Sequence, residues 1–147
     1  MYKHLLVPVD GSPLSLKALD SAAGLAGALR AAITVVTVSP PFPMMVAGDG
    51  YVLDLNSPSE WEASIERHSV KVRQAAEKRA KSKNVTIKFV SVVAEQPYEG
   101  IINTAKKSKC DVIVMASHGR RGLSALLLGS ETIKVLTHSK IPVLVCR

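Results

Sequence analysis

The sequence has few aromatic residues and only two cysteines, which argues against an aromatic core and against a cysteine-based metal or redox site. Aromatic residues make up 4% of the chain, so its core must be built mainly from Val, Ile, Leu and Ala. Cys110 and Cys146 lie far apart and show no spacing typical of a metal or redox motif. We therefore interpret both cysteines as small buried hydrophobic residues.

Long hydrophobic runs are also missing. No stretch approaches the ~20 apolar residues that a helix needs to span a bilayer. The apolar run at residues 4–9 is too short for a secretion signal, and an aspartate follows it. These features predict a cytoplasmic protein that makes no membrane contact.

The chain is basic, with a formal net charge of +7. Much of the excess lies in residues 66–83, at helical spacing and mixed with glutamates, which is typical of a solvated helix face. The basic residues lack the interleaved aromatic side chains on which nucleic-acid bases stack. We therefore expect no nucleic-acid partner, although the positive surface can attract an anionic ligand.

Short apolar runs alternate with helical patterns along the whole chain. We expect strands at 4–9, 31–39, 84–93, 110–117 and 142–147, and helices at 13–30, 58–82, 97–109 and 130–139. Ser12 and Ser57 each precede a proline, which predicts two capped helix starts. The alternation predicts one α/β domain over 1–147, with an open parallel sheet covered by helices on both faces.

Two predicted strands end in residues suited to a binding site, because ligands of such sheets bind where the strand order reverses. The first ends in "PVDGS", which contains Asp10, and the fourth ends in "MASHGRRG". If these strands are neighbours, Asp10 faces the loop 117–122 across one crevice. The alternative for Asp10 is a turn-forming residue that bonds its own backbone.

Glycines punctuate the stretch after the fourth strand. We expect Gly119 to adopt a positive φ, and Gly129 to form the left-handed cap of a short helical turn at 123–128. Ser130 would then cap the last helix, and the amides of Ser130, Glu131 and Thr132 would form an anion site. The alternative is a purely structural pair of turns with glycine caps.

Motifs for catalysis and for other nucleotide folds are missing. The chain contains no GxxxxGK[ST] loop, no GxGxxG after the first strand and no Ser/His/Asp pattern. His118 is the residue that most resembles a catalytic group, and we expect it to hydrogen-bond locally. Tyr51 and Trp61 can either cover a ligand or pack in the core, and the second role is favoured. We therefore predict that the protein is not an enzyme.

The stretch "MASHGRRGLSALLLGS" resembles the ATP-binding signature of universal stress proteins, which is Gly, two residues, Gly, nine residues, Gly, then Ser or Thr. Gly119, Gly129 and Ser130 match this spacing. "LLVPVDGS" and "IPVLVCR" resemble the first and last strands of the family. The resemblance implies a five-stranded sheet in the order 3-2-1-4-5, of the adenine nucleotide alpha hydrolase type. It also implies a homodimer formed through the C-terminal strand, 142–146.

The resemblance also implies an ATP site with Mg²⁺ or Mn²⁺ on the phosphates. In that site Val9, Asp10 and Val38 contact adenine and ribose, Met115 and His118 line the pocket, and the phosphates lie against Gly119, Gly129, Ser130, Glu131 and Thr132. Pro8, Ala116 and Arg120 complete the nucleotide-binding set.

Two residues depart from the family pattern. Ala116 replaces the first glycine, where its methyl group can crowd the ribose, and Glu131 brings a carboxylate to the phosphate site. Arg120 and Arg121 can offset that negative charge.

The leading hypothesis is thus an ATP-binding regulatory protein of the stress response without strong catalysis. The alternative is a dimeric, stress-associated interaction protein of the same fold that binds no ATP, which Ala116 and Glu131 favour. An adenylate-forming enzyme is a third candidate, but the chain lacks the HIGH and SGGxDS signatures of those enzymes.

Overall fold

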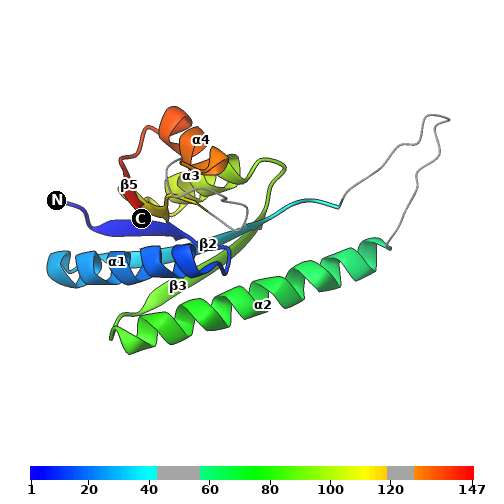
Figure 1. Ribbon diagram of the computed structural model, residues 1–147, viewed down its shortest axis with the longest axis horizontal. Helices are drawn as coiled ribbons and strands as arrows, with labels where there is room; N and C mark the ends of the chain where they lie inside the picture. Colours follow the sequence, from blue (N-terminus) through cyan, green and yellow to red (C-terminus); the bar gives the residue numbers. More distant parts are fainter. Residues whose placement is uncertain (43–56, 119–127) are drawn as a thin grey trace.

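Five parallel strands form one sheet in the computed structural model, which describes residues 1–42, 57–118 and 128–147 (Figure 1). The strands are β1 (His4–Pro8), β2 (Ala32–Ser39), β3 (Ile87–Val93), β4 (Val112–Ala116) and β5 (Val143–Cys146). The helices are α1 (Pro13–Leu29), α2 (Pro58–Ser82), α3 (Pro97–Lys107) and α4 (Ser130–His138). The sheet order is β3-β2-β1-β4-β5, which confirms the predicted fold and puts β1 next to β4.

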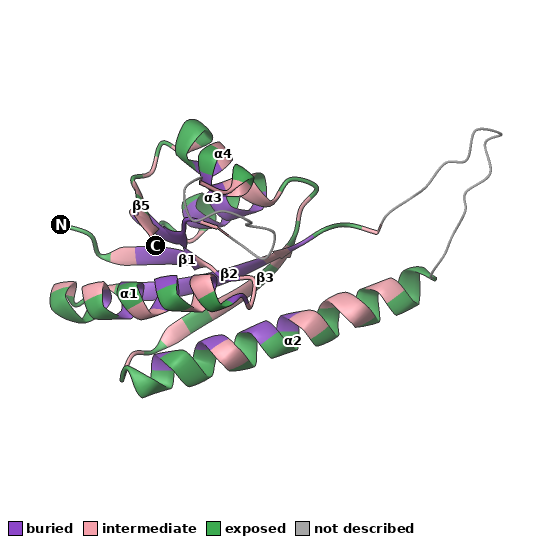
Figure 2. Cartoon of the chain, viewed as in Figure 1, coloured by how far each residue is buried: buried purple, intermediate pink, exposed green. Residues whose placement is uncertain are grey.

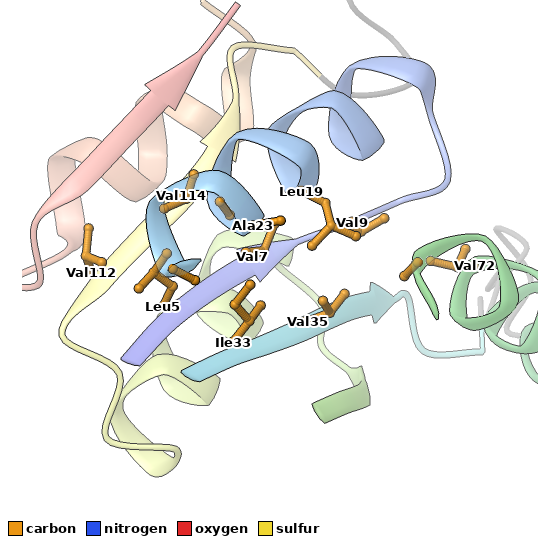
Figure 3. Close-up of a cluster of buried hydrophobic side chains, with 13 residues drawn as sticks. Leu5, Val7, Val9, Leu19, Ala23, Ile33, Val35, Val72, Val112 and Val114 are labelled. Atoms are coloured by element: carbon orange, nitrogen blue, oxygen red, sulfur yellow. The ribbon is translucent and has the colours of Figure 1, made fainter. Parts of the chain in front are cut away.

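Helices cover the sheet on both faces and create two apolar clusters. Leu5, Val35 and Val114 lie on one face and pack with residues of α1 and α2 (Figure 3). Leu6 and Ile113 lie on the other face and pack with residues of α3 and α4. Because successive side chains of a strand point to opposite faces, β1 and β4 are buried on both sides. Figure 2 shows the buried residues of β1 in purple.

Helix starts follow the sequence signals closely. The Ser12 hydroxyl accepts a hydrogen bond from the Ser15 amide at 3.2 Å, and Pro13 occupies the first turn of α1. Ser57 caps α2 in the same way and forms a reciprocal capping box with Glu60. Both predicted caps are confirmed.

Three predicted element boundaries were wrong because turn residues shortened the elements. The third strand begins at Ile87 instead of residue 84, since Asn84 has a left-handed φ of 55° and still belongs to the turn after α2. The third helix ends at Lys107, two residues early, and Lys109 has a φ of 54°. The fourth strand covers 112–116 instead of 110–117. The other boundaries agree to within one residue.

The two cysteines differ in burial. Cys110 is buried beside Ile113, and burial raises the pKa of its thiol to about 11, so it stays protonated at neutral pH. Cys146 is only half-buried, so the interpretation of both as buried was wrong for Cys146. The reason is its position on β5, at the edge of the sheet.

The ladder between β1 and β4 is short, and this opens the sheet at one end. Its pairs are Leu5 with Val112 and Leu6 with Ile113, although both strands continue beyond them. The Val9 amide donates to Val36 of β2 at 2.8 Å, so the preceding nitrogen, that of Pro8, faces β4. Proline has no N–H with which to continue the ladder.

In the described parts of the chain, no helix combines the length and the apolar character needed to cross a bilayer.

Candidate functional site

The end of β4 with the residues that follow it, 116–118, lies against the start of α4. The turn 9–12 follows β1, the strand next to β4 in the sheet. Two interactions tie α4 to the end of β4. The Gly129 amide donates to the Ser117 carbonyl at 2.7 Å, and the Thr132 hydroxyl lies 3.1 Å and 3.2 Å from the carbonyls of Ala116 and Ser117. The first turn of α4 is therefore held against this end of the sheet.

Gly129 has a different role from the predicted one. Its φ of −63° and ψ of 150° are extended, so it is the N-cap of α4 and not a left-handed cap. Ser130 is consequently the first helical residue instead of the cap. A Cβ at Gly129 would lie 3.2 Å from the Ser117 oxygen and 3.3 Å from the His118 Cα. Glycine is therefore needed here for close approach between two backbone segments.

The first turn of α4 offers backbone amides to a ligand. In a helix the amides of the first residues, here Ser130, Glu131 and Thr132, have no partner within the helix. Their partial positive charge favours an anion. The Thr132 hydroxyl, by contrast, donates to the two carbonyls, and Thr132 is only 3% exposed. This side chain therefore holds the first turn of α4 in place.

Glu131 points toward α3 and away from a ligand over the first turn of α4. Its Oε2 accepts a hydrogen bond from the Tyr98 amide at 2.9 Å, and its Oε1 lies 3.1 Å from Lys134 Nζ. It thereby caps α3, whose own N-cap residue, Gln96, makes no side-chain cap bond. The predicted repulsion between this carboxylate and a phosphate is therefore offset by two local partners.

Removing the Glu131 carboxylate should destabilise the fold. We expect Glu131→Ala to lower the free energy of unfolding by about 1 kcal/mol, because the Tyr98 amide loses its cap. Urea titration followed by circular dichroism measures this. Glu95→Ala, which removes an exposed carboxylate just before the same helix, is the matched control and should change stability by less than about 0.5 kcal/mol. Equal losses in both variants would contradict the capping role.

Asp10 bonds the backbone of its own turn, which was the alternative interpretation of this residue. Its Oδ1 accepts a hydrogen bond from the Ser12 amide at 2.9 Å, and its own amide donates to Ser15 Oγ at 3.3 Å. Gly11, between them, has a φ of 84°, which favours glycine. These bonds hold Asp10 at the carboxyl end of β1, so the turn role and contact with a ligand are compatible.

The residues predicted to surround adenine and ribose lie on both faces of the sheet. Val38 and Met115 belong to the cluster on the α3 face, where Met115 is 6% exposed. Val9 packs in the cluster on the α1 face. By the alternation of β4, the Ala116 methyl group lies on that α1 face too, on the opposite side of the strand from Met115. Pro8 is half-buried at the end of β1.

His118 hydrogen-bonds locally, as predicted. Its Nδ1 lies 3.0 Å from the hydroxyl of Ser117, and its buried Nε2 has no partner among the described residues. Gly119, Arg120, Arg121 and Tyr51 lie outside the described residues. Trp61 packs edge-on against Phe42, with 6.3 Å between ring centroids.

The sequence analysis missed two residues near this end of the sheet. A Cβ at Gly100 would lie 2.9 Å from Val38 Cγ1, so this glycine lets α3 approach the end of β2. A glycine inside a predicted helix was a usable signal. Ser39 ends β2, is 2% exposed, and its hydroxyl has no partner within the described ranges. Nothing in the sequence distinguishes it from other strand-end serines.

The described residues contain no cluster of three His, Cys, Asp or Glu side chains that could hold a metal ion.

Comparison with known proteins identifies close similarity over the whole chain. The model of the universal stress protein family matches residues 1–147. Universal stress protein YxiE of Bacillus subtilis is 31% identical over 155 residues and covers 100% of both chains.

Solved structures have the same fold. The structure of the hypothetical protein MJ0577, from Methanocaldococcus jannaschii, has a TM-score of 0.79 and 26% identity, over 99% of this chain and 95% of that chain. A universal stress protein solved in complex with cAMP has a TM-score of 0.70 and 27% identity, over 99% of this chain and 97% of that chain.

Proposed function

The chain belongs to the universal stress protein family, and from this premise we propose that it binds ATP in the crevice between β1 and β4. The observation that carries the proposal is the start of α4, whose first-turn amides are held against the end of β4 by Gly129 and Thr132. A solved relative of the same fold carries cAMP, another adenine nucleotide. The phosphates of ATP would lie on the amides of Ser130, Glu131 and Thr132.

The adenine would contact the apolar surface of Val38 and Met115 on the α3 face of the sheet. Asp10 lies at the end of β1, where its carboxylate can accept a hydrogen bond from a ribose hydroxyl. Gly119 and Arg120 belong to this proposed site through the family signature alone. A Mg²⁺ or Mn²⁺ ion fits as a companion of the phosphates, whose charge it neutralises, with phosphate oxygens and water as its ligands.

We propose that ATP acts here as a regulatory ligand, in a cytoplasmic protein of the stress response. Ser117 and His118 form the one hydroxyl–imidazole pair that the described residues place at the site, but Ser117 is 3% exposed and cannot reach a phosphate as a nucleophile. Hydrolysis uses water as the nucleophile, and His118, whose Nδ1 faces Ser117 and whose Nε2 is buried, is not placed to activate it, so we expect hydrolysis to be very slow.

The test uses the purified protein. Denaturation should release an adenine nucleotide that absorbs at 260 nm and is identified by its mass. Calorimetric titration of the nucleotide-free protein should show Mg-ATP binding in preference to Mg-GTP. If neither experiment detects a nucleotide at millimolar concentration, the alternative function, a dimeric interaction protein without ATP, takes its place.

A homodimer through β5 completes the proposal. In the described chain β5 pairs with β4 alone, so its outer edge is open. Leu144 on β5 is 45% exposed, and Ile133 and Leu136 on the neighbouring α4 are 49% and 42% exposed. Pairing with the same strand of a second copy would cover these apolar side chains across a two-fold axis.

Charge on β5 should therefore separate the subunits. We expect the double variant Val143→Lys/Val145→Lys to raise the dimer dissociation constant at least about tenfold, measured by sedimentation equilibrium. Val93→Lys is the matched control, because Val93 is 62% exposed on β3 at the opposite edge of the sheet. Dimerisation that survives the double variant, or that is lost in the control, would contradict the assignment.

A further inference from the structure

A cavity of about 610 Å³ that is open to solvent lies on the surface, at the opposite end of the sheet from the proposed nucleotide crevice. It is found where α1 ends and where β2 and β3 begin, toward the left of Figure 1. Its apolar wall includes Ala26, Gly27, Ala31, Ile33, Val85 and Ile87. Its volume falls within the roughly 300–1,000 Å³ of small-molecule sites.

The cavity exists because small residues occupy the last turns of α1. A Cβ added at Gly27 would meet no atom within 4 Å. Ile33 is buried beneath the cavity, and Val85 and Ile87 are only partly buried against the same core cluster. A larger side chain at Gly27 would therefore enter open space instead of the packed core.

The polar residues of the cavity are cationic or neutral. Arg30 and Lys88 line it and are exposed, and none of its lining residues is acidic. The salt bridges found in the described chain involve other cations, so these two charges have no ion-pair partner there. His4 also lines the cavity, and its Nε2 lies 2.8 Å from Thr34 Oγ1.

An apolar wall beside two unpaired cations fits a ligand with the complementary structure. We propose that this cavity binds a small amphipathic anion, with an alkyl or aryl body against the α1 wall and a carboxylate or sulfonate at Arg30 and Lys88. The site is separate from the nucleotide crevice and does not depend on ATP binding.

Titration with the fluorescent anion 8-anilinonaphthalene-1-sulfonate (ANS) tests the proposal. Octanoate should displace the probe, whereas acetate, which lacks the apolar body, and 1-octanol, which lacks the charge, should compete at least about tenfold more weakly. Mg-ATP should not displace it. Displacement by Mg-ATP, or equal competition by acetate or 1-octanol, would overturn the assignment.

Two glycines of α1 provide a matched pair of variants. Gly27→Leu should place a side chain over the α1 wall of the cavity and weaken ANS binding at least about tenfold, while Gly24→Leu should leave the affinity unchanged. Gly24 is also exposed with no atom within 4 Å of an added Cβ, but it does not line the cavity. Unchanged affinity in the Gly27 variant would overturn the proposal.

The cations are tested in the same way. Arg30→Gln combined with Lys88→Gln should weaken ANS and octanoate binding about fivefold or more, because two exposed charge contacts are lost. Lys83→Gln is the control, since Lys83 is exposed at the end of α2 but does not line the cavity. Equal losses in the control would show general attraction to a basic surface and would contradict a defined site.

Discussion

Gly129→Val should weaken Mg-ATP binding at least about tenfold, measured by calorimetric titration. The Cβ of any larger residue would lie 3.2 Å from the Ser117 carbonyl oxygen and 3.3 Å from the His118 Cα. Both are backbone atoms, which cannot turn aside as a flexible side chain would. Valine adds two methyl groups to this crowded position, so the start of α4 must move away from β4.

Backbone strain is not the cause of the expected loss. Gly129 has a φ of −63°, which every residue adopts, and serine is at least as favourable as glycine at a helix N-cap. Gly129→Ser should therefore lose affinity despite being a favoured capping residue, because its Cβ meets the same two atoms. We expect Mg-ATP affinity to be highest with glycine at position 129, lower with alanine or serine, and lowest with valine.

Gly24→Val is the control for Gly129→Val. It makes the same substitution on α1 at a position where an added Cβ meets no atom within 4 Å. ATP affinity should stay within about twofold of the parent, and circular dichroism should show both variants folded. Full affinity in a folded Gly129→Val variant would show that ATP binding does not depend on the contact between α4 and β4.

The fold could be predicted because its signals are local. Apolar runs that end in turn residues mark the strands, and Ser-Pro pairs mark two helix starts. The order of the strands, however, came from the family resemblance. Residues 84–86 were assigned to a strand because they continue its alternation, although Asn84 in fact completes the turn after α2.

The sequence names candidate residues for the site, but it does not contain the contacts that arrange them. The glycine at 129 was expected for its conformational freedom, whereas its role depends on Ser117, a residue twelve positions earlier in the chain. The direction of Glu131 depends on Tyr98, in another helix. Contacts of this kind join segments that are distant in sequence, and a local pattern does not contain them.

Gly100→Ala should destabilise the protein by up to about 2 kcal/mol, although the same change inside most helices stabilises. Alanine is favoured over glycine by about 1 kcal/mol in a helix interior. At this position the new Cβ would lie 2.9 Å and 3.1 Å from the two γ carbons of Val38 and 3.2 Å from the Ala94 Cβ. Overpacking of this kind costs about 1–3 kcal/mol, and valine is stiff about χ1, so the steric term exceeds the helix term.

A second change should reverse the effect of the first. In the background of Val38→Ala the γ carbons are gone, and Gly100→Ala should then cost less than about 0.5 kcal/mol. Gly24→Ala, with no atom near its added Cβ, should instead raise the free energy of unfolding by about 0.5–1 kcal/mol. Urea titration of the four variants measures the coupling. Equal effects of Gly100→Ala in both backgrounds would contradict the close packing of α3 against Val38 at the end of β2.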